Sequence, residues 1–300
     1  MKTLVARRAR VTVDVVRPNQ DGQGDTALSY QFEQHRMSIQ VGQGGNQFGN
    51  AKVQILGVPL DDMNQIARLW LETLTPSATD KMRIDVWDGT DFVPFFSGVI
   101  TWSAVNASGA PNVALEIEAN DSAVGMVQPA PPYAQEGPIL MKDVLEAILG
   151  PVGLVVELAE SVPVYQLTKV RLNGTPIDQA SQLMSAFPDL TWYINLQRFL
   201  VRPANGPLGG DPLPVSKTTG MIGYPVYSTS GITLATLFDP RLRPGLALDV
   251  QTAFDFVNRT KWVAAVLQHN LQPNTPGGQW ITQIAAQSYG TKGDTAGEPA

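Results

Sequence analysis

Residues 262–287, WVAAVLQHNLQPNTPGGQWITQIAAQ, carry the clearest fold signal in the chain. Two runs that contain aromatic and β-branched residues, Trp262–His269 and Trp280–Gln287, flank the turn-forming segment Pro273–Gly278. This pattern predicts a long β-hairpin. On its N-terminal side, further strands are predicted at Gly231–Phe238 and Leu246–Val250.

Similar strand patterns fill the first third of the chain. Val11, Val13 and Val15 alternate with polar residues, which is the period of a half-buried strand. Comparable runs occur at residues 28–32, 37–41, 51–55, 82–86, 92–102 and 113–117. Six or seven strands with a single helix predict a small β-barrel or sandwich.

Three local features of this region give specific expectations. The runs on either side of Glu33–Arg36 predict a hairpin, and Gly42–Gly49 (GQGGNQFG) is too rich in glycine to predict anything but a loop. A helix is predicted from Leu60, capped by Asp61 or Asp62. Its apolar positions are Ile66, Leu69, Trp70 and Leu74, and Pro76 ends it.

The middle of the chain has a different composition. A proline-rich break at Gln128–Pro132 precedes an amphipathic helix over Ile139–Ile148, and Pro176 is placed to open a second helix through Ala186. Strands are predicted at residues 154–158 and 164–172, and a hairpin over residues 192–202. Asn205–Pro214 is a linker rich in Gly and Pro. This pattern predicts a small α+β unit.

The predicted fold class is therefore mainly β with an α+β insertion. The predicted domains are a first β-barrel at 1–127, a small α+β domain at 128–205, a second β-rich domain at 206–290 and a disordered tail at 291–300. No short exact repeat is visible in the sequence. A length of 300 residues accommodates two or three domains.

Composition excludes several functional classes. The 21 basic and 27 acidic residues give a net charge of −6, which argues against a dedicated or sequence-specific nucleic-acid binder. The absence of cysteine excludes disulfides, thiolate nucleophiles and cysteine-ligated metals. No apolar run approaches the ~20 residues of a membrane span, and the N-terminal run is shorter than a signal peptide core. The sequence thus predicts a soluble chain with no membrane-spanning segment.

No motif predicts catalysis, a cofactor or a metal. Gly42–Gly49 lacks the Lys-Ser/Thr of a phosphate-binding loop. His35 and His269 are the only histidines, and neither has a His, Asp or Glu nearby at the spacing of metal ligands. Asp85, Asp88 and Asp91 are better explained by an Asp-Gly hairpin turn than by a calcium loop. Paired carboxylates drawn from distant positions remain possible in principle, and the candidates are Glu33, Glu116, Glu118 and Glu157.

Arginines mark two further segments. Arg7, Arg8 and Arg10 are interpreted as flanking the first strand rather than binding phosphate. Arg241 and Arg243 lie in a proline-stiffened turn, which suits a fixed contact between subunits as well as it suits a turn. Gly42–Gly49 and Arg241–Pro244 are therefore the candidate interface segments.

Several segments, taken in order, resemble one protein family. They are Phe48–Pro59 (FGNAKVQILGVP), Phe96–Ile100 (FSGVI), Thr219–Gly223 (TGMIG), Phe238–Gly245 (FDPRLRPG), Val263–His269 and Trp280–Ala286. In this order they resemble bacteriophage tail baseplate hub proteins over about two thirds of the chain.

The resemblance implies a structural, non-enzymatic hub in the virion tail baseplate, assembled in the host cytoplasm. It implies a homotrimer in which two tube-like β-barrel domains per chain approximate a six-fold ring, so that the six-fold tail tube meets the three-fold central spike. Implied partners are tail tube or distal tail proteins, the spike protein and the tape-measure protein. Low charge suits large permanent interfaces, and a negative net charge fits a channel wall that does not hold DNA. The alternatives are a tail-associated cell-wall-degrading enzyme and another tail tube or distal tail protein.

Overall fold

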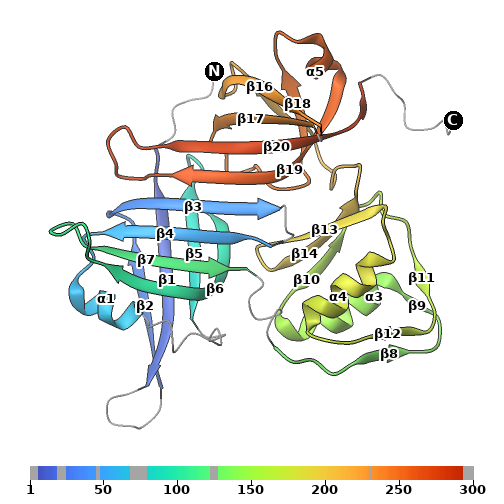
Figure 1. The fold of residues 1–300 in the computed structure, drawn as a ribbon, viewed down its shortest axis with the longest axis horizontal. Coiled ribbons are helices and arrows are strands. Elements are labelled where there is room, and N and C mark those ends of the chain that lie inside the picture. The colour runs from blue at the N-terminus through green and yellow to red at the C-terminus, as the bar shows by residue number, and fades with distance from the viewer. Residues whose placement is uncertain are drawn as a thin grey trace.

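Strands dominate the computed structural model, which describes residues 6–18, 25–44, 48–67, 80–121, 128–229 and 231–292. Most strand pairs are antiparallel, and the few described helices are short (Figure 1). The prediction of a mainly β fold with an α+β insertion is confirmed. The described residues gather around three hydrophobic clusters, and we name the corresponding parts the first unit (residues 6–121), the middle unit (residues 128–208) and the last unit (residues 213–292).

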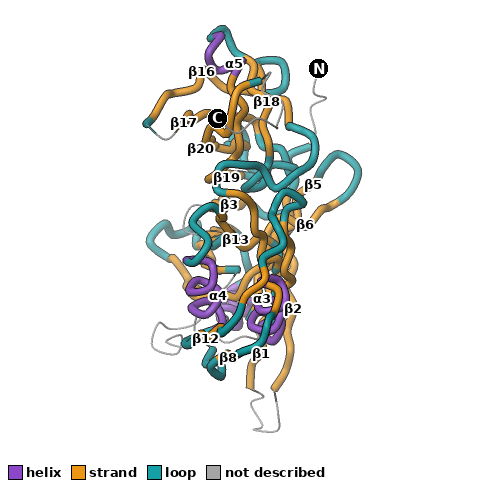
Figure 2. The backbone as a smooth tube through the Cα atoms, turned by 90° about the vertical axis from the view of Figure 1, so that its right-hand side faces the viewer, coloured by secondary structure: helices purple, strands orange, loops and turns teal. Residues whose placement is uncertain are grey.

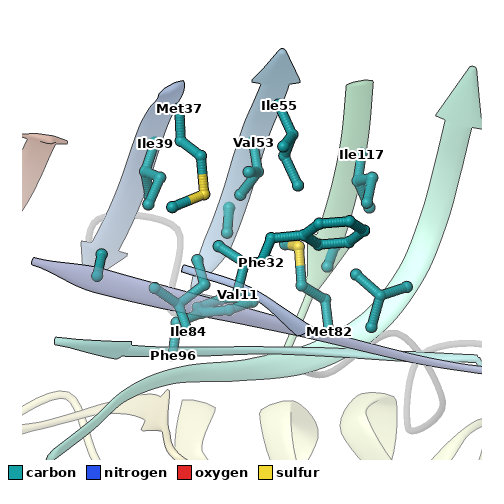
Figure 3. Close-up of a cluster of buried hydrophobic side chains, with 14 of the residues drawn as sticks. Val11, Phe32, Met37, Ile39, Val53, Ile55, Met82, Ile84, Phe96 and Ile117 are labelled. Atoms are coloured by element: carbon teal, nitrogen blue, oxygen red, sulfur yellow. The ribbon is translucent and has the colours of Figure 1, made fainter. Parts of the chain in front are cut away.

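The first unit is a two-layered β structure. Its elements are β1 (Ala9–Pro18), β2 (Asp25–Phe32), β3 (Arg36–Gly44), β4 (Asn50–Leu56), α1 (Leu60–Ile66), β5 (Lys81–Trp87), β6 (Phe92–Asn106) and β7 (Ala114–Asn120). Their order in the sheet is β3-β4-β7-β6-β5-β1-β2. Side chains alternate across each strand, so Ile39, Val53 and Ile117 point inward and face Val11 and Ile84 from the opposite layer (Figure 3). Within the described residues, the predicted six or seven strands and one helix are confirmed.

Two local predictions for this unit are wrong. β2 pairs with β1, and β3 pairs with β4 and β19, so the strands on either side of Glu33–Arg36 do not form a hairpin. The bend between them carries the chain from one layer to the other. The helix begins after Pro59 with no side-chain cap, and Asp61 and Asp62 lie inside its first turn, where their charge favours the helix dipole.

Within the described residues, helix α1 is also shorter than predicted. It ends at Ile66 because Ala67 is extended. Leu69, Trp70, Leu74 and Pro76 lie outside the described residues.

The middle unit packs two helices on a small sheet. Its elements are β8 (Tyr133–Gln135), β9 (Ile139–Leu140), α3 (Met141–Leu149), η2 (Gly150–Val152), β10 (Val155–Leu158), β11 (Gln166–Leu167), β12 (Val170–Leu172), α4 (Pro176–Ser185), β13 (Leu190–Asn195) and β14 (Arg198–Pro203). Pro176 opens α4 as predicted, and Thr175 caps it through reciprocal hydrogen bonds with Asp178. Ile139, predicted as helical, instead pairs in strand β9, and α3 starts at Met141.

The last unit returns to β structure. Its elements are β15 (Leu213–Ser216), β16 (Met221–Ser228), β17 (Gly231–Leu237), β18 (Ala247–Gln251), α5 (Asp255–Arg259), β19 (Thr260–Leu271) and β20 (Trp280–Thr291). β19 and β20 form the predicted long hairpin. Trp262 is buried at the centre of the cluster, and its indole N–H donates to the Val257 carbonyl at 2.9 Å.

The first and last units share one strand order. In the first unit it is β3-β4-β7-β6-β5-β1, and in the last unit it is β16-β17-β20-β19-β18-β15. A bulge at the same place supports this equivalence, since the pairing of β6 with β7 skips Thr101 and that of β19 with β20 skips Ala265. One difference is the last pair, which is antiparallel for β1 and β5 but parallel for β15 and β18. The chain therefore contains a structural repeat that no short sequence repeat reveals.

The two repeated units are joined into one sheet. β3 of the first unit pairs with β19 of the last unit, which makes a single path from β16 at one end to β2 at the other. Strands β17, β20, β19, β3, β4 and β7 lie side by side across the molecule in Figure 1, and the turned view of Figure 2 shows β16, β17, β20, β19 and β3 following one another from top to bottom. We call the β3–β19 pairing the seam.

Substitutions in β3 test whether this strand is a core element. Ile39 is fully buried, and its Ile39→Ala variant is expected to lose about 2–5 kcal/mol of unfolding free energy through lost burial and a residual cavity. The neighbouring Gln40 is exposed, so Gln40→Ala should change stability by less than about 0.5 kcal/mol. Denaturant unfolding of both variants measures the difference. Equal losses would show that β3 is not packed as described.

Candidate functional site

The seam is the clearest candidate for a functional region because it unites the repeated units. Its antiparallel register runs from Gly44 opposite Val266 to Ile39 opposite Leu271. Gly42–Gly44 therefore belongs to a strand, and the prediction that Gly42–Gly49 is wholly a loop is wrong at these residues. Residues 45–47 of that segment lie outside the described residues. Strand pairing overrides glycine's loop preference here because the neighbouring backbone needs the space.

Gly44 shows this requirement directly. Its φ is +76°, a conformation that side chains rarely allow. A Cβ at this position would fall far inside van der Waals contact of the Ala265 carbonyl oxygen, the bulged residue of β19. Only glycine lets β3 approach the bulge this closely.

An aromatic core lies under the seam. His269 of β19 is fully buried, and its Nδ1 lies 2.9 Å from the Thr282 hydroxyl. The imidazole contacts the edges of two rings, Phe95 at 4.8 Å from the first unit and Phe238 at 5.6 Å from the last. Burial lowers the pKa of His269 to about 3, so the ring is neutral at pH 7. His269 is thus a packing residue shared by both units.

The second candidate segment, Arg241–Pro244, holds the middle unit against the seam. Asp239 accepts two hydrogen bonds from the Arg241 guanidinium, at 3.0 and 2.8 Å. The Tyr193 hydroxyl of the middle unit donates to the Pro244 carbonyl, and burial raises the pKa of this phenol to about 12. The segment therefore makes internal contacts as a constrained turn.

Both candidate segments meet at one cavity. Gly44 and Pro244 line a cavity of about 310 Å³ together with Tyr193 and Arg202 of the middle unit. Phe48 also reaches the middle unit, with its ring 5.8 Å from that of Trp192. The three units thus meet at the two segments that we predicted as interface segments, Gly42–Gly49 and Arg241–Pro244. Their role toward other chains stays a prediction.

The exposed face of the sheet is rich in amides across the seam. Gln283 lies opposite Gln268, Asn270 opposite Gln40, and Lys52 opposite Glu118. Directly opposite residues share a face of the sheet. Lys52 and Glu118 neutralise each other in an ion pair of 2.9 Å. This face therefore presents hydrogen-bonding groups with little net charge over both repeated units.

The carboxylates considered for catalysis have structural partners. Glu33 accepts from Arg8 and Arg10, Glu116 from Gln54 and Asn106, and Glu157 from Arg198. Glu118 belongs to the ion pair with Lys52. These partners engage the carboxylates in contacts of the fold. Glu116 and Glu118 lie two residues apart on the same face of β7, and both lie near Lys52.

The N-terminal arginines and the Asp-Gly turn also have defined contacts in the structure. Arg8 lies over Trp87 and Arg10 over Phe92, so both arginines have the predicted structural role beside the first strand. Asp88 accepts from the backbone N–H groups of Thr90 and Asp91, which confirms the Asp-Gly turn. Among the described ranges, no three His, Cys, Asp or Glu side chains gather as metal ligands, and no helix is long and apolar enough to cross a membrane.

Comparisons with known proteins identify the fold. No family model and no curated protein sequence matches the chain. A tail protein from Neisseria meningitidis MC58 has a similar structure, with a TM-score of 0.62 at 11% identity over 93% of this chain and 96% of that protein. The 43 kDa tail protein of prophage MuSo2 from Shewanella oneidensis gives a TM-score of 0.60 at 8% identity over 93% and 97%.

A secretion-system protein has the same fold. The E. coli c3393 protein is described as a component of the type VI secretion system with structural similarity to T4 bacteriophage tail proteins gp27 and gp5. It gives a TM-score of 0.57 at 11% identity over 85% of this chain and 73% of that protein. The chain thus has the fold shared by phage tail proteins and this secretion-system component, as the resemblance to hub proteins led us to expect.

Glycine substitutions test the seam. Gly44→Ala is expected to destabilise the chain by several kcal/mol, because it combines positive-φ strain with a clash against β19. Gly57→Ala is the matched control, since Gly57 has a φ of +80° but no atom within 4 Å of its Cβ position. It should cost only about 1–2 kcal/mol. Denaturant unfolding gives both values, and equal losses would contradict a close β3–β19 approach.

The buried histidine predicts a pH dependence. The folded pKa of His269, about 3, lies below the unfolded value near 6.5, so the unfolded state binds the proton first as pH falls. Stability contributed by neutral His269 is therefore complete above about pH 6.5 and declines toward pH 3, by up to about 1.4 kcal/mol per pH unit. His269→Gln should flatten this slope, whereas His35→Gln, which leaves His269 in place, should preserve it. Unfolding free energies between pH 4 and 7 make the comparison, and an unchanged slope in His269→Gln would refute it.

Proposed function

We propose that the chain is a structural hub component of a phage tail baseplate, trimerising to adapt a six-fold tail tube to a three-fold central spike. The observation that carries this proposal is the repeat of one strand order in the first and last units, joined by the seam. Two equivalent units per chain mean that three copies supply six units around one axis. This is the copy number that a match between three-fold and six-fold symmetry requires.

Other features support the same role. The shared fold of two tail proteins and a secretion-system component agrees with it. The amide-rich face, with Lys52 and Glu118 neutralised, suits a channel wall past which a charged polymer moves without being held. We further propose that the domain division follows the sequence boundaries at 127, 205 and 290, and that the role is non-enzymatic.

The proposal includes partners and a location. The partners are tail tube or distal tail proteins on one side, the central spike protein on the other, and the tape-measure protein. The protein would belong to the baseplate of the virion tail and assemble in the host cytoplasm. A tail tube or distal tail protein is the nearest alternative, since it shares the support of the fold, and it is distinguished by a six-fold rather than three-fold ring. A cell-wall-degrading enzyme is distinguished by turnover of peptidoglycan.

The mass of the purified chain tests the proposal. Light scattering is expected to give three times 32.4 kDa, either alone or after addition of the recombinant tube and spike proteins encoded with it. The trimer should bind both partners at its two ends. A chain that stays monomeric with both partners present, or that forms six-membered rings, would contradict the hub assignment. Hydrolysis of peptidoglycan by the isolated chain would favour the enzyme instead.

A further inference from the structure

Arg202 of β14 is a buried cation for which the described residues provide no anionic partner. It is only 5% exposed and makes no ion pair with a described carboxylate, whereas Arg198 of the same strand pairs with Glu157 at 2.8 Å. Burial lowers the pKa of Arg202, but an arginine stays protonated at pH 7. A buried charge without a counter-charge is costly. A group that supplies the negative charge would therefore stabilise this part of the chain.

The hydrogen bonds of Arg202 leave one edge of its guanidinium available. Nη1 donates to the carbonyls of Pro203, Ala204 and Gly206 at 3.0, 3.3 and 2.7 Å, which holds the turn after β14. Nε is buried without a partner, and Nη2 makes no hydrogen bond with a described residue. The N–H groups of Nε and Nη2 point in the same direction from one edge of the plane. This is an arrangement that binds both oxygens of a carboxylate.

The cavity beside Arg202 suits an anionic ligand. Arg202 lines the cavity of about 310 Å³ at which the three units meet. Three further lining residues carry neutral side chains that donate hydrogen bonds, Thr191 and Asn205 of the middle unit and Gln287 of β20. Among the described residues that line the cavity, none is Asp or Glu. The cavity thus combines one cation with neutral hydrogen-bonding groups.

The nearby phenol and glycine leave the charge of Arg202 uncompensated. Burial raises the pKa of Tyr193 to about 12, so its hydroxyl is neutral at pH 7 and supplies no negative charge. That hydroxyl already donates to the Pro244 carbonyl. A Cβ on Gly245 would lie 3.3 Å from Nε of Arg202 and 3.2 Å from the Tyr193 hydroxyl oxygen. Glycine at this position therefore keeps a side chain off both groups.

We propose that this cavity is a binding site for a carboxylate group, held by the Nε and Nη2 edge of Arg202. A single cation matches the single charge of a carboxylate better than the larger charge of a phosphate. The carboxylate comes from an acidic side chain of another polypeptide or from a free small acid, since both offer the same two oxygens. The site does not depend on the hub assignment, because one chain supplies the whole cavity.

Calorimetric titration of the purified full chain tests the site. The probes are sodium acetate and N-acetyl-glutamate N-methylamide, at pH 7 and constant ionic strength, with uncharged acetamide as the matched control for acetate. One saturable site per chain is expected for at least one carboxylate probe and none for acetamide. Tighter binding of the blocked glutamate supports the site with a polypeptide ligand, and equal or tighter binding of acetate supports it with a free acid. No saturable binding of either carboxylate would overturn the proposal.

Substitutions of Arg202 test whether its guanidinium holds the ligand. Arg202→Met keeps a long side chain without the charge and is expected to raise the dissociation constant for the carboxylate probes at least tenfold. Arg202→Lys keeps the charge without the planar edge and should fall between Arg202→Met and the wild type. Arg198→Met removes an exposed charge from the same strand and should leave the constant unchanged. Equal constants for Arg202→Met and the wild type would overturn the proposal.

A second pair of variants keeps the test decisive if Arg202→Met does not fold. Gln287→Glu places a carboxylate at the cavity from an exposed position, where it competes for Arg202 and repels the probe. It is expected to raise the dissociation constant at least tenfold. Gln283→Glu makes the same change of net charge at an exposed position of β20 that does not line the cavity, and it should leave the constant unchanged. Unchanged binding by Gln287→Glu would show that the carboxylate binds elsewhere and would overturn the proposal.

Discussion

The pairing of β3 with β19 is the contact on which the rest of the structure depends. It joins strands more than two hundred residues apart and makes one sheet of two β units that would otherwise be separate. Its close approach is possible because Gly44 has no side chain to meet the bulge at Ala265. The neutral imidazole of His269 then fills the core below, between Phe95 and Phe238.

The low share of charged residues, 16% of the chain, agrees with this joint. A sheet that crosses from one unit to the other needs a continuous exposed face, and amides with a neutralised Lys52–Glu118 pair provide it without a strong field. The segment Thr218–Phe238, which contains β16 at the end of the sheet, is also uncharged. Burying charges in permanent contacts is costly, so a low charge content agrees with the proposed assembly.

Local signals in the sequence were sufficient for much of the fold. Pro176 and the alternating runs predicted a helix start, the β19–β20 hairpin and the mainly β class, because each depends on neighbours in the chain. The seam could not be predicted, since Gly42 and Gly44 carry the composition of a loop and acquire strand geometry only from β19. The β2–β3 hairpin failed for a related reason: alternation fixes the faces of a strand but not its partner. The repeat was hidden because strand order, and not residue identity, is what the two units share.

The central claim is that three copies of one chain supply six equivalent β units around one axis. Electron cryo-microscopy of the assembled particle tests it most directly, because it shows both the number of copies and the spacing of the units. The account predicts a three-fold ring with six β units at nearly equal angular steps. A ring whose units cluster in three separated pairs, or one made of six copies, would contradict it.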